Sequence, residues 1–161
     1  MHFPDFNIEL IISRLKQTGN QICTAESCTG GMIATLITDI PGSSAVFSRG
    51  YVTYSNQAKI DMLGVRSATL ELYGAVSAQT VSEMASGALI ASGDEAEYSV
   101  AISGIAGPDG GSDEKPVGLV FIGVLKKGAL GKVSNHIFEG DRQAIRHQAA
   151  NAALHAVYEL M

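Results

Sequence analysis

The chain has 161 residues, of which 46% are hydrophobic and 17% charged, and its formal net charge is −5. This composition is typical of a packed globular domain and excludes a disordered chain. No apolar run approaches the roughly 20 residues of a membrane span, no secretory signal is visible, and the negative charge disfavours general nucleic-acid binding. We therefore expect one domain over residues 1–161, with neither a membrane nor a nucleic-acid partner.

The two cysteines, Cys23 and Cys28, are too few for a disulfide framework or a zinc site. Reduced thiols and a cytoplasmic location are the expectation. Cys28 as a catalytic thiol is an alternative, although no histidine lies near it in sequence. The four histidines are widely spaced and supply no metal site; they are His2, His136, His147 and His155.

The first predicted helix covers residues 5–18, where isoleucines and leucine recur at helical spacing. A short apolar strand follows at 21–25, and a second helix is predicted over 32–40. The turn between them runs from Glu26 to Gly31 and is rich in Ser, Thr and Gly. Free N–H groups at such a helix start suit an anion such as phosphate. Alternatively, Ser27 or Thr29 caps the helix.

The segment from Pro41 to Lys59 carries the side chains with the most chemical interest. Strand-type residues at 46–47 and 51–54 flank Arg49-Gly50 and predict a hairpin. A serine hydroxyl becomes a nucleophile when a base removes its proton, and a lysine of lowered pKa can be that base. Ser44, Tyr54 and Lys59 offer these groups, provided that Ser44 folds back across the hairpin. A polar hairpin without activity is the alternative.

Short helices are predicted at 56–63 and 68–73, and Ser77 caps a longer helix that extends to about residue 92. A strand at 98–102 leads into a glycine-rich loop, 103–111, which is either an anion-binding nest or a mobile connector. Two antiparallel strands follow at 117–125 and 132–138. The last helix covers 141–160, with Arg142 and Arg146 one turn apart near its start. These arginines either bind phosphate or carboxylate, or are solvated surface charges.

This order of elements predicts a three-layer α/β/α sandwich with a mixed sheet. Such folds place ligands in the loops that follow the carboxyl ends of strands. Here those loops are Glu26–Gly31, Tyr54–Lys59 and Ser103–Gly111. The alanine-rich helix faces make a homo-oligomer an expectation.

Six ordered motifs resemble the CinA C-terminal domain family. They are AESCTGG at 25–31, PGSS at 41–44, VTYSN at 52–56 with Ala58-Lys59, GAVS at 74–77, GIAGP at 104–108 with Gly110-Gly111, and KPVG at 115–118. The resemblance extends from about residue 8 to the C-terminus and implies an α/β/α sandwich. It also implies hydrolysis of the carboxamide of nicotinamide mononucleotide to nicotinic acid mononucleotide and ammonia, in pyridine-nucleotide salvage.

The resemblance implies a catalytic group of Ser44, Tyr54 and Lys59. In the mechanism that we expect from it, Ser44 is the nucleophile, Ser43 is its rival and Ser27 is the second rival. It puts Ser27 and Thr29 in a ligand-lined turn and Arg142 in the site. The phosphate candidates are Arg142 and the turns made by Thr29, Gly30 and Gly31 and by Ile105, Ala106 and Gly107. The scheme needs no metal or cofactor. The alternative function is a non-catalytic nucleotide-binding or interaction module of the competence/damage-inducible type, although no residue here supports a direct DNA role.

Overall fold

Five strands form one mixed sheet in the computed structural model, which describes residues 5–161. The sheet order is β2-β1-β3-β4-β5; β1 pairs in parallel with both β2 and β3, whereas β4 and β5 continue the sheet in antiparallel pairs. The predicted mixed sheet is confirmed. The strands are β1 (Ile22–Glu26), β2 (Phe47–Val52), β3 (Tyr98–Gly104), β4 (Leu119–Lys126) and β5 (Lys132–Ile137).

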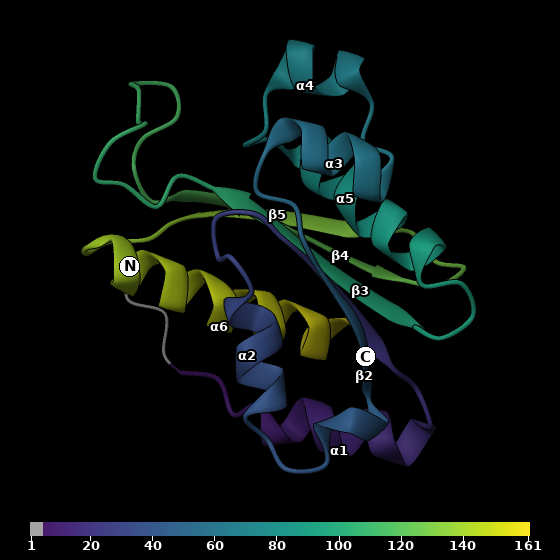
Figure 1. Cartoon of the computed structure of the whole chain (residues 1–161). Helices are drawn as coiled ribbons and strands as arrows, with labels where there is room; N and C mark the ends of the chain where they lie inside the picture. Colours follow the sequence, from purple (N-terminus) through teal and green to yellow (C-terminus); the bar gives the residue numbers. More distant parts are fainter. Residues whose placement is uncertain (1–4) are drawn as a thin grey trace.

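Helices cover both faces of this sheet, as the three-layer prediction requires (Figure 1). One layer contains α1 (Glu9–Thr18), α2 (Met32–Thr38) and α6 (Arg142–Leu160). The other contains α3 (Asn56–Leu63), α4 (Ser67–Tyr73) and α5 (Ala78–Ala91), and a short 3₁₀ helix, η1 (Ser43–Ala45), precedes β2. Over residues 5–161, none of the helices combines the length and the apolar character that crossing a membrane requires.

Alternating side chains of the central strands fill two separate cores. Ile22, Val100 and Ile102 belong to the cluster under α1, α2 and α6. Cys23 and Ala101 belong to the cluster under α3, α4 and α5. Successive strand residues point to opposite faces, so a strand that is buried on both sides must be apolar at nearly every position. All five residues of β1 are buried; Ile22, Cys23 and Ala25 are apolar, whereas Thr24 and Glu26 are buried polar residues.

The predicted hairpin around Arg49-Gly50 is wrong, because β2 is one continuous strand. Arg49 and Gly50 pair with Cys23 and Thr24 in the parallel ladder to β1. A Cβ at Gly50 would lie 3.2 Å from the Thr24 hydroxyl and 3.6 Å from Cβ of Ala34. This glycine therefore allows close packing inside a strand and does not form a turn.

The remaining boundaries differ from the predicted ones by a few residues, most of all at the first helix. That helix starts at Glu9 and not at residue 5, and the Asn7 side chain, two residues before it, accepts the Glu9 backbone N–H at 3.1 Å. Ser55 caps α3 and Ser77 caps α5, so these helices begin where their capping residues predict.

Candidate active site

Three loops meet at the carboxyl ends of the three parallel strands. They follow Glu26 at the end of β1, Val52 at the end of β2 and Gly104 at the end of β3. Because β2, β1 and β3 are neighbours in the sheet, their following loops are neighbours too. The predicted convergence of the loops at 26–31, 54–59 and 103–111 is confirmed.

Lys59 lies at the centre of this edge, and its side chain is fully buried at 0% exposure. Its Nζ is 2.8 Å from the Thr53 carbonyl oxygen, 3.1 Å from that of Tyr54 and 3.0 Å from Oγ of Ser27. A neutral amine has two N–H groups and one lone pair. A protonated Nζ donates to Oγ of Ser27 as well as to the two carbonyls. In the neutral amine the two carbonyls can take the N–H groups, and the lone pair can then accept the Ser27 hydroxyl.

Burial lowers the pKa of Lys59 from its ordinary 10.5 to about 8, and the nearby Cys28 partly opposes this shift. The cause is desolvation, since a buried amine loses the hydration that favours its charged form. A lysine with this pKa has a substantial neutral fraction near physiological pH. Lys59 therefore meets the chemical requirement for a general base beside a serine.

Ser27 is held in place by its own backbone, and its side chain is nearly buried. The N–H of Ser27 donates to the carbonyl of Ile102 at 3.1 Å, which extends the β1–β3 pairing past the strand end. The next two N–H groups, of Cys28 and Thr29, donate to no oxygen acceptor within residues 5–161. Two unengaged N–H groups beside a serine hydroxyl provide donors for an oxyanion.

The start of α2 is occupied by a carboxylate of the chain itself. Oε2 of Glu26 accepts the N–H groups of Gly31 and Ile33 at 3.0 Å each, and Oε1 accepts that of Ala34 at 2.9 Å. The Gly30 N–H donates to the Ser27 carbonyl at 3.1 Å. The predicted anion site at this helix start is therefore wrong, and so is its capping by Ser27 or Thr29.

Two arginines near the start of α6 hold the loops together. Arg142 donates through Nη1 to the Gly107 carbonyl at 2.7 Å and through Nη2 to the Tyr54 hydroxyl at 3.2 Å. Arg146 donates to the carbonyls of Cys28 and Thr29 at 3.0 and 2.8 Å. The sequence indicated Arg146 only through its one-turn spacing from Arg142, and its part in holding the serine turn was not foreseen.

Ser44 is not brought to Lys59 within this chain. It is an exposed residue of η1, before β2, whereas Lys59 lies beyond the other end of that strand. Six extended residues span roughly 16 Å at about 3.3 Å each. The buried Ser43 lies in the same short helix. The predicted approach of Ser44 depended on a hairpin that does not form, and Ser27 occupies the place beside the amine.

The predicted residues of the glycine-rich loop lie between β3 and Arg142. Ile105 donates its N–H to the Leu119 carbonyl at 2.9 Å, and Ala106 is buried. The Gly107 carbonyl accepts from Arg142. This loop is thus tied to β4 through Leu119 and to α6 through Arg142.

Neither cysteine has the properties of a reactive thiol. Burial raises the pKa of Cys23 and of Cys28 to about 11, so both are protonated at neutral pH. Within the described residues, no group of three or more His, Cys, Asp or Glu side chains could hold a metal ion.

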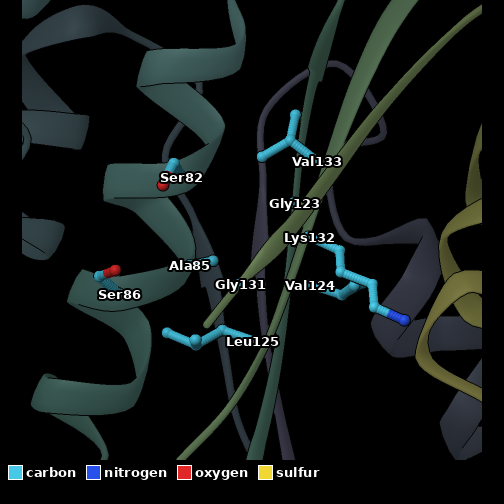
Figure 2. A pocket seen from close by; sticks show the side chains of 9 residues that line it. All are labelled: Ser82, Ala85, Ser86, Gly123, Val124, Leu125, Gly131, Lys132 and Val133. Carbon is cyan, nitrogen blue, oxygen red and sulfur yellow. The ribbon is translucent and has the colours of Figure 1, made fainter. Parts of the chain in front are cut away.

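A small pocket of about 40 Å³ lies away from this site, between α5 and the β4–β5 pair (Figure 2). Ser82 and Ser86 of α5 line one side, and Val133 lies on β5. The side chain of Lys132 extends away from the two serines. Lys132 is the one basic residue among the described residues that line this pocket, and it points away from both serines, unlike the arrangement at Ser27.

The fold and the site together define an α/β/α protein with a buried serine–lysine pair at the carboxyl ends of parallel strands. The model of the CinA C-terminal domain matches residues 6–161. The chain belongs to the CinA C-terminal domain family.

Its relatives include enzymes with names that state an activity. The chain is 53% identical to the nicotinamide-nucleotide amidohydrolase PncC of Escherichia coli K12, over 94% of this chain and 90% of that protein. It is 58% identical to PncC of Enterobacter agglomerans, over 84% of this chain and 82% of that protein. The match to the CinA-like protein of Chloroherpeton thalassium is 51% and covers only 35% of that longer protein.

Solved structures of the same family have the same fold. The competence/damage inducible protein CihA from Agrobacterium tumefaciens is 48% identical and superposes with a TM-score of 0.89, covering 98% of this chain and 97% of that chain. The competence damage-inducible protein A from Klebsiella pneumoniae is 36% identical, also with a TM-score of 0.89.

Proposed function

We propose that this protein is a nicotinamide-nucleotide amidohydrolase, which converts nicotinamide mononucleotide and water to nicotinic acid mononucleotide and ammonia in pyridine-nucleotide salvage. The names of its relatives in Escherichia coli and Enterobacter agglomerans support this reaction. The structural observation that carries the proposal is the 3.0 Å contact between Nζ of buried Lys59 and Oγ of Ser27.

In the proposed mechanism Ser27 is the nucleophile, in place of Ser44. Neutral Lys59 accepts the proton of Ser27 as Oγ attacks the carboxamide carbon, and the carbonyl π electrons move to oxygen. The free N–H groups of Cys28 and Thr29 donate to that oxyanion, a kind of contact worth about 3–4 kcal/mol per donor. Protonated Lys59 then gives its proton to the departing amine, the C–N bond breaks, and ammonia leaves.

Water completes the reaction by hydrolysing the acyl ester. Lys59 accepts a proton from the water as its oxygen attacks, and Ser27 regains a proton when the ester C–O bond breaks. The products are a carboxylic acid and the free enzyme, so atoms balance and neither a metal nor a redox cofactor takes part in these steps.

Arg142 and Tyr54 are the proposed contacts for the rest of the nucleotide. Arg142 reaches both the Gly107 loop and the Tyr54 hydroxyl, and Tyr54 is 61% exposed. A guanidinium with donors in a planar fork suits a phosphate. Because Glu26 occupies the start of α2, we place the substrate phosphate at Arg142 and not at the turn of Gly30 and Gly31.

Paired serine variants test this assignment. We expect Ser27→Ala to abolish ammonia release from nicotinamide mononucleotide, and Ser44→Ala to retain it within about twofold, because only Ser27 lies beside Lys59. Loss of activity in Ser44→Ala with normal activity in Ser27→Ala would restore the Ser44 assignment.

Wild-type protein that releases no ammonia would count against the enzyme and in favour of the binding-module alternative. A thermal shift with nicotinamide mononucleotide would then identify binding without turnover, since a bound ligand raises apparent stability. The homo-oligomeric state and the cytoplasmic location remain predictions.

A further inference from the structure

Glu26 has no role in the mechanism above, yet it is one of the most completely buried polar residues, at 1% exposure. Its carboxylate accepts three backbone N–H groups, from Gly31, Ile33 and Ala34, at 2.9–3.0 Å. Such bonds and the helix dipole stabilise a negative charge at the first turn of a helix. A buried carboxylate thus fixes the turn of residues 27–31.

This turn contains all the groups proposed to act on the carbonyl. Ser27 directly follows Glu26, and the free N–H groups belong to Cys28 and Thr29. The carboxylate of Glu26 accepts the N–H of Gly31, at the other end of the same turn. The turn is therefore fixed at both ends by one residue, through the peptide bond at one end and through the side chain at the other.

The backbone of Glu26 also reaches the lysine side of the pair. Its carbonyl accepts the N–H of Thr53 at 2.8 Å, and the Thr53 carbonyl in turn lies 2.8 Å from Nζ of Lys59. Glu26 thus connects the serine turn with the loop that holds the base. A change confined to its side chain disturbs the serine turn and leaves the connection to Thr53 in place.

We propose that Glu26 is a positioning residue for the reaction. Its side chain fixes the turn so that the Ser27 hydroxyl and the N–H groups of Cys28 and Thr29 face the same point. This inference rests on the proposed function for its substrate, but it concerns the geometry of the nucleophile and therefore also applies to other electrophiles that react with Ser27.

Glu26→Gln tests the proposal, because the amide keeps the volume but replaces one acceptor with a donor that faces a backbone N–H. We expect kcat for ammonia release to fall at least tenfold, since loss of one oxyanion donor alone costs about 10²–10³-fold. KM should stay within about threefold, because Arg142 and Tyr54 are unchanged. Glu26→Asp keeps the charge on a shorter side chain and should also lower kcat.

Glu83→Gln is the matched control. Glu83 also accepts a backbone N–H, that of Arg66 at 2.9 Å, and it bonds the Thr69 hydroxyl at 2.7 Å, but it holds α4 to α5. Its loss should lower Tm without changing kcat by more than about twofold. A purely structural role for Glu26 would give the same pattern as Glu83, namely lower Tm with unchanged kcat.

A second measurement separates this inference from the proposed substrate. A fluorophosphonate forms an O–P bond to the serine and releases fluoride as the P–F bond breaks, and intact mass with Ser27→Ala as the blank reports the rate. We expect Glu26→Gln to slow this labelling at least tenfold, whether or not the wild type hydrolyses nicotinamide mononucleotide.

Inactivity of the wild type alone would count against the proposed function only. Folded Glu26→Gln and Glu26→Asp proteins with labelling and kcat within about twofold of the wild type would overturn the positioning role. Failure of both variants to fold would assign Glu26 to folding and would overturn it as well.

Discussion

Raising the pH from 7 to 9 should increase kcat/KM for ammonia release about tenfold, because only neutral Lys59 can accept the proton of Ser27. With the pKa of Lys59 at about 8, the neutral fraction is about one tenth at pH 7 and about nine tenths at pH 9. A lysine with the ordinary pKa of 10.5 would be neutral in only about one molecule in 3,000 at pH 7. Burial thus raises the concentration of active base about 300-fold.

The assay measures released ammonia with nicotinamide mononucleotide at constant ionic strength. The second pKa of a phosphate monoester is about 6, so above pH 7 the charge of the substrate is nearly constant. The expected profile has a single inflection near pH 8 and a plateau above it. A profile that is flat between pH 7 and 9, or one that still rises beyond pH 10, would refute Lys59 as the base.

Three further predictions use other measurements. Relative to Lys59→Met, the unfolding free energy of the wild type should rise by up to about 3 kcal/mol between about pH 8 and 10.5. The reason is that in this range the unfolded chain still binds the proton that folded Lys59 has lost. Denaturant titrations that show a fall over this range would contradict the assigned pKa. Gly87→Ala should lower stability by about 1–3 kcal/mol with little change in kcat, because its Cβ would lie 1.9 Å from the Leu63 carbonyl oxygen; an unchanged Tm would contradict this packing. Arg142→Lys should raise KM for the mononucleotide at least tenfold and leave the unphosphorylated riboside unaffected, and an equal effect on both substrates would remove Arg142 from the phosphate site.

The layers and most helices of this fold could be predicted because their signals are local. A serine at the N-cap is readable without knowledge of the fold, and Ser77 correctly predicted the start of α5. The alternation of strands and helices then predicted which loops lie at the same edge of the sheet. The convergence of these loops was therefore predicted correctly, whereas the partners of individual side chains within them were not.

The pairing of the site residues could not be predicted, because it depends on strand order. Ser27 and Lys59 are 32 residues apart in sequence, and Tyr54 and Arg142 are 88 apart. The conformation at Gly50 decided the outcome, since a glycine within a strand-type run is compatible either with a turn or with close packing inside a strand. A turn at Gly50 would bring Ser44 back to Lys59. The continuous strand β2 instead places Ser44 before its amino end and Lys59 beyond its carboxyl end.

Glu26 and Lys59 illustrate two different ways of burying an ionisable group at one site. Glu26 is given three N–H donors, so its carboxylate has fixed partners at the start of α2. Nζ of Lys59 contacts carbonyl oxygens and a hydroxyl, but no carboxylate among the described residues. Desolvation therefore lowers its pKa to about 8. A carboxylate beside Lys59 would hold the lysine charged and remove the base. Because the two groups have different partners, Glu26 can take its proposed positioning role while Lys59 stays available for the proposed proton transfer.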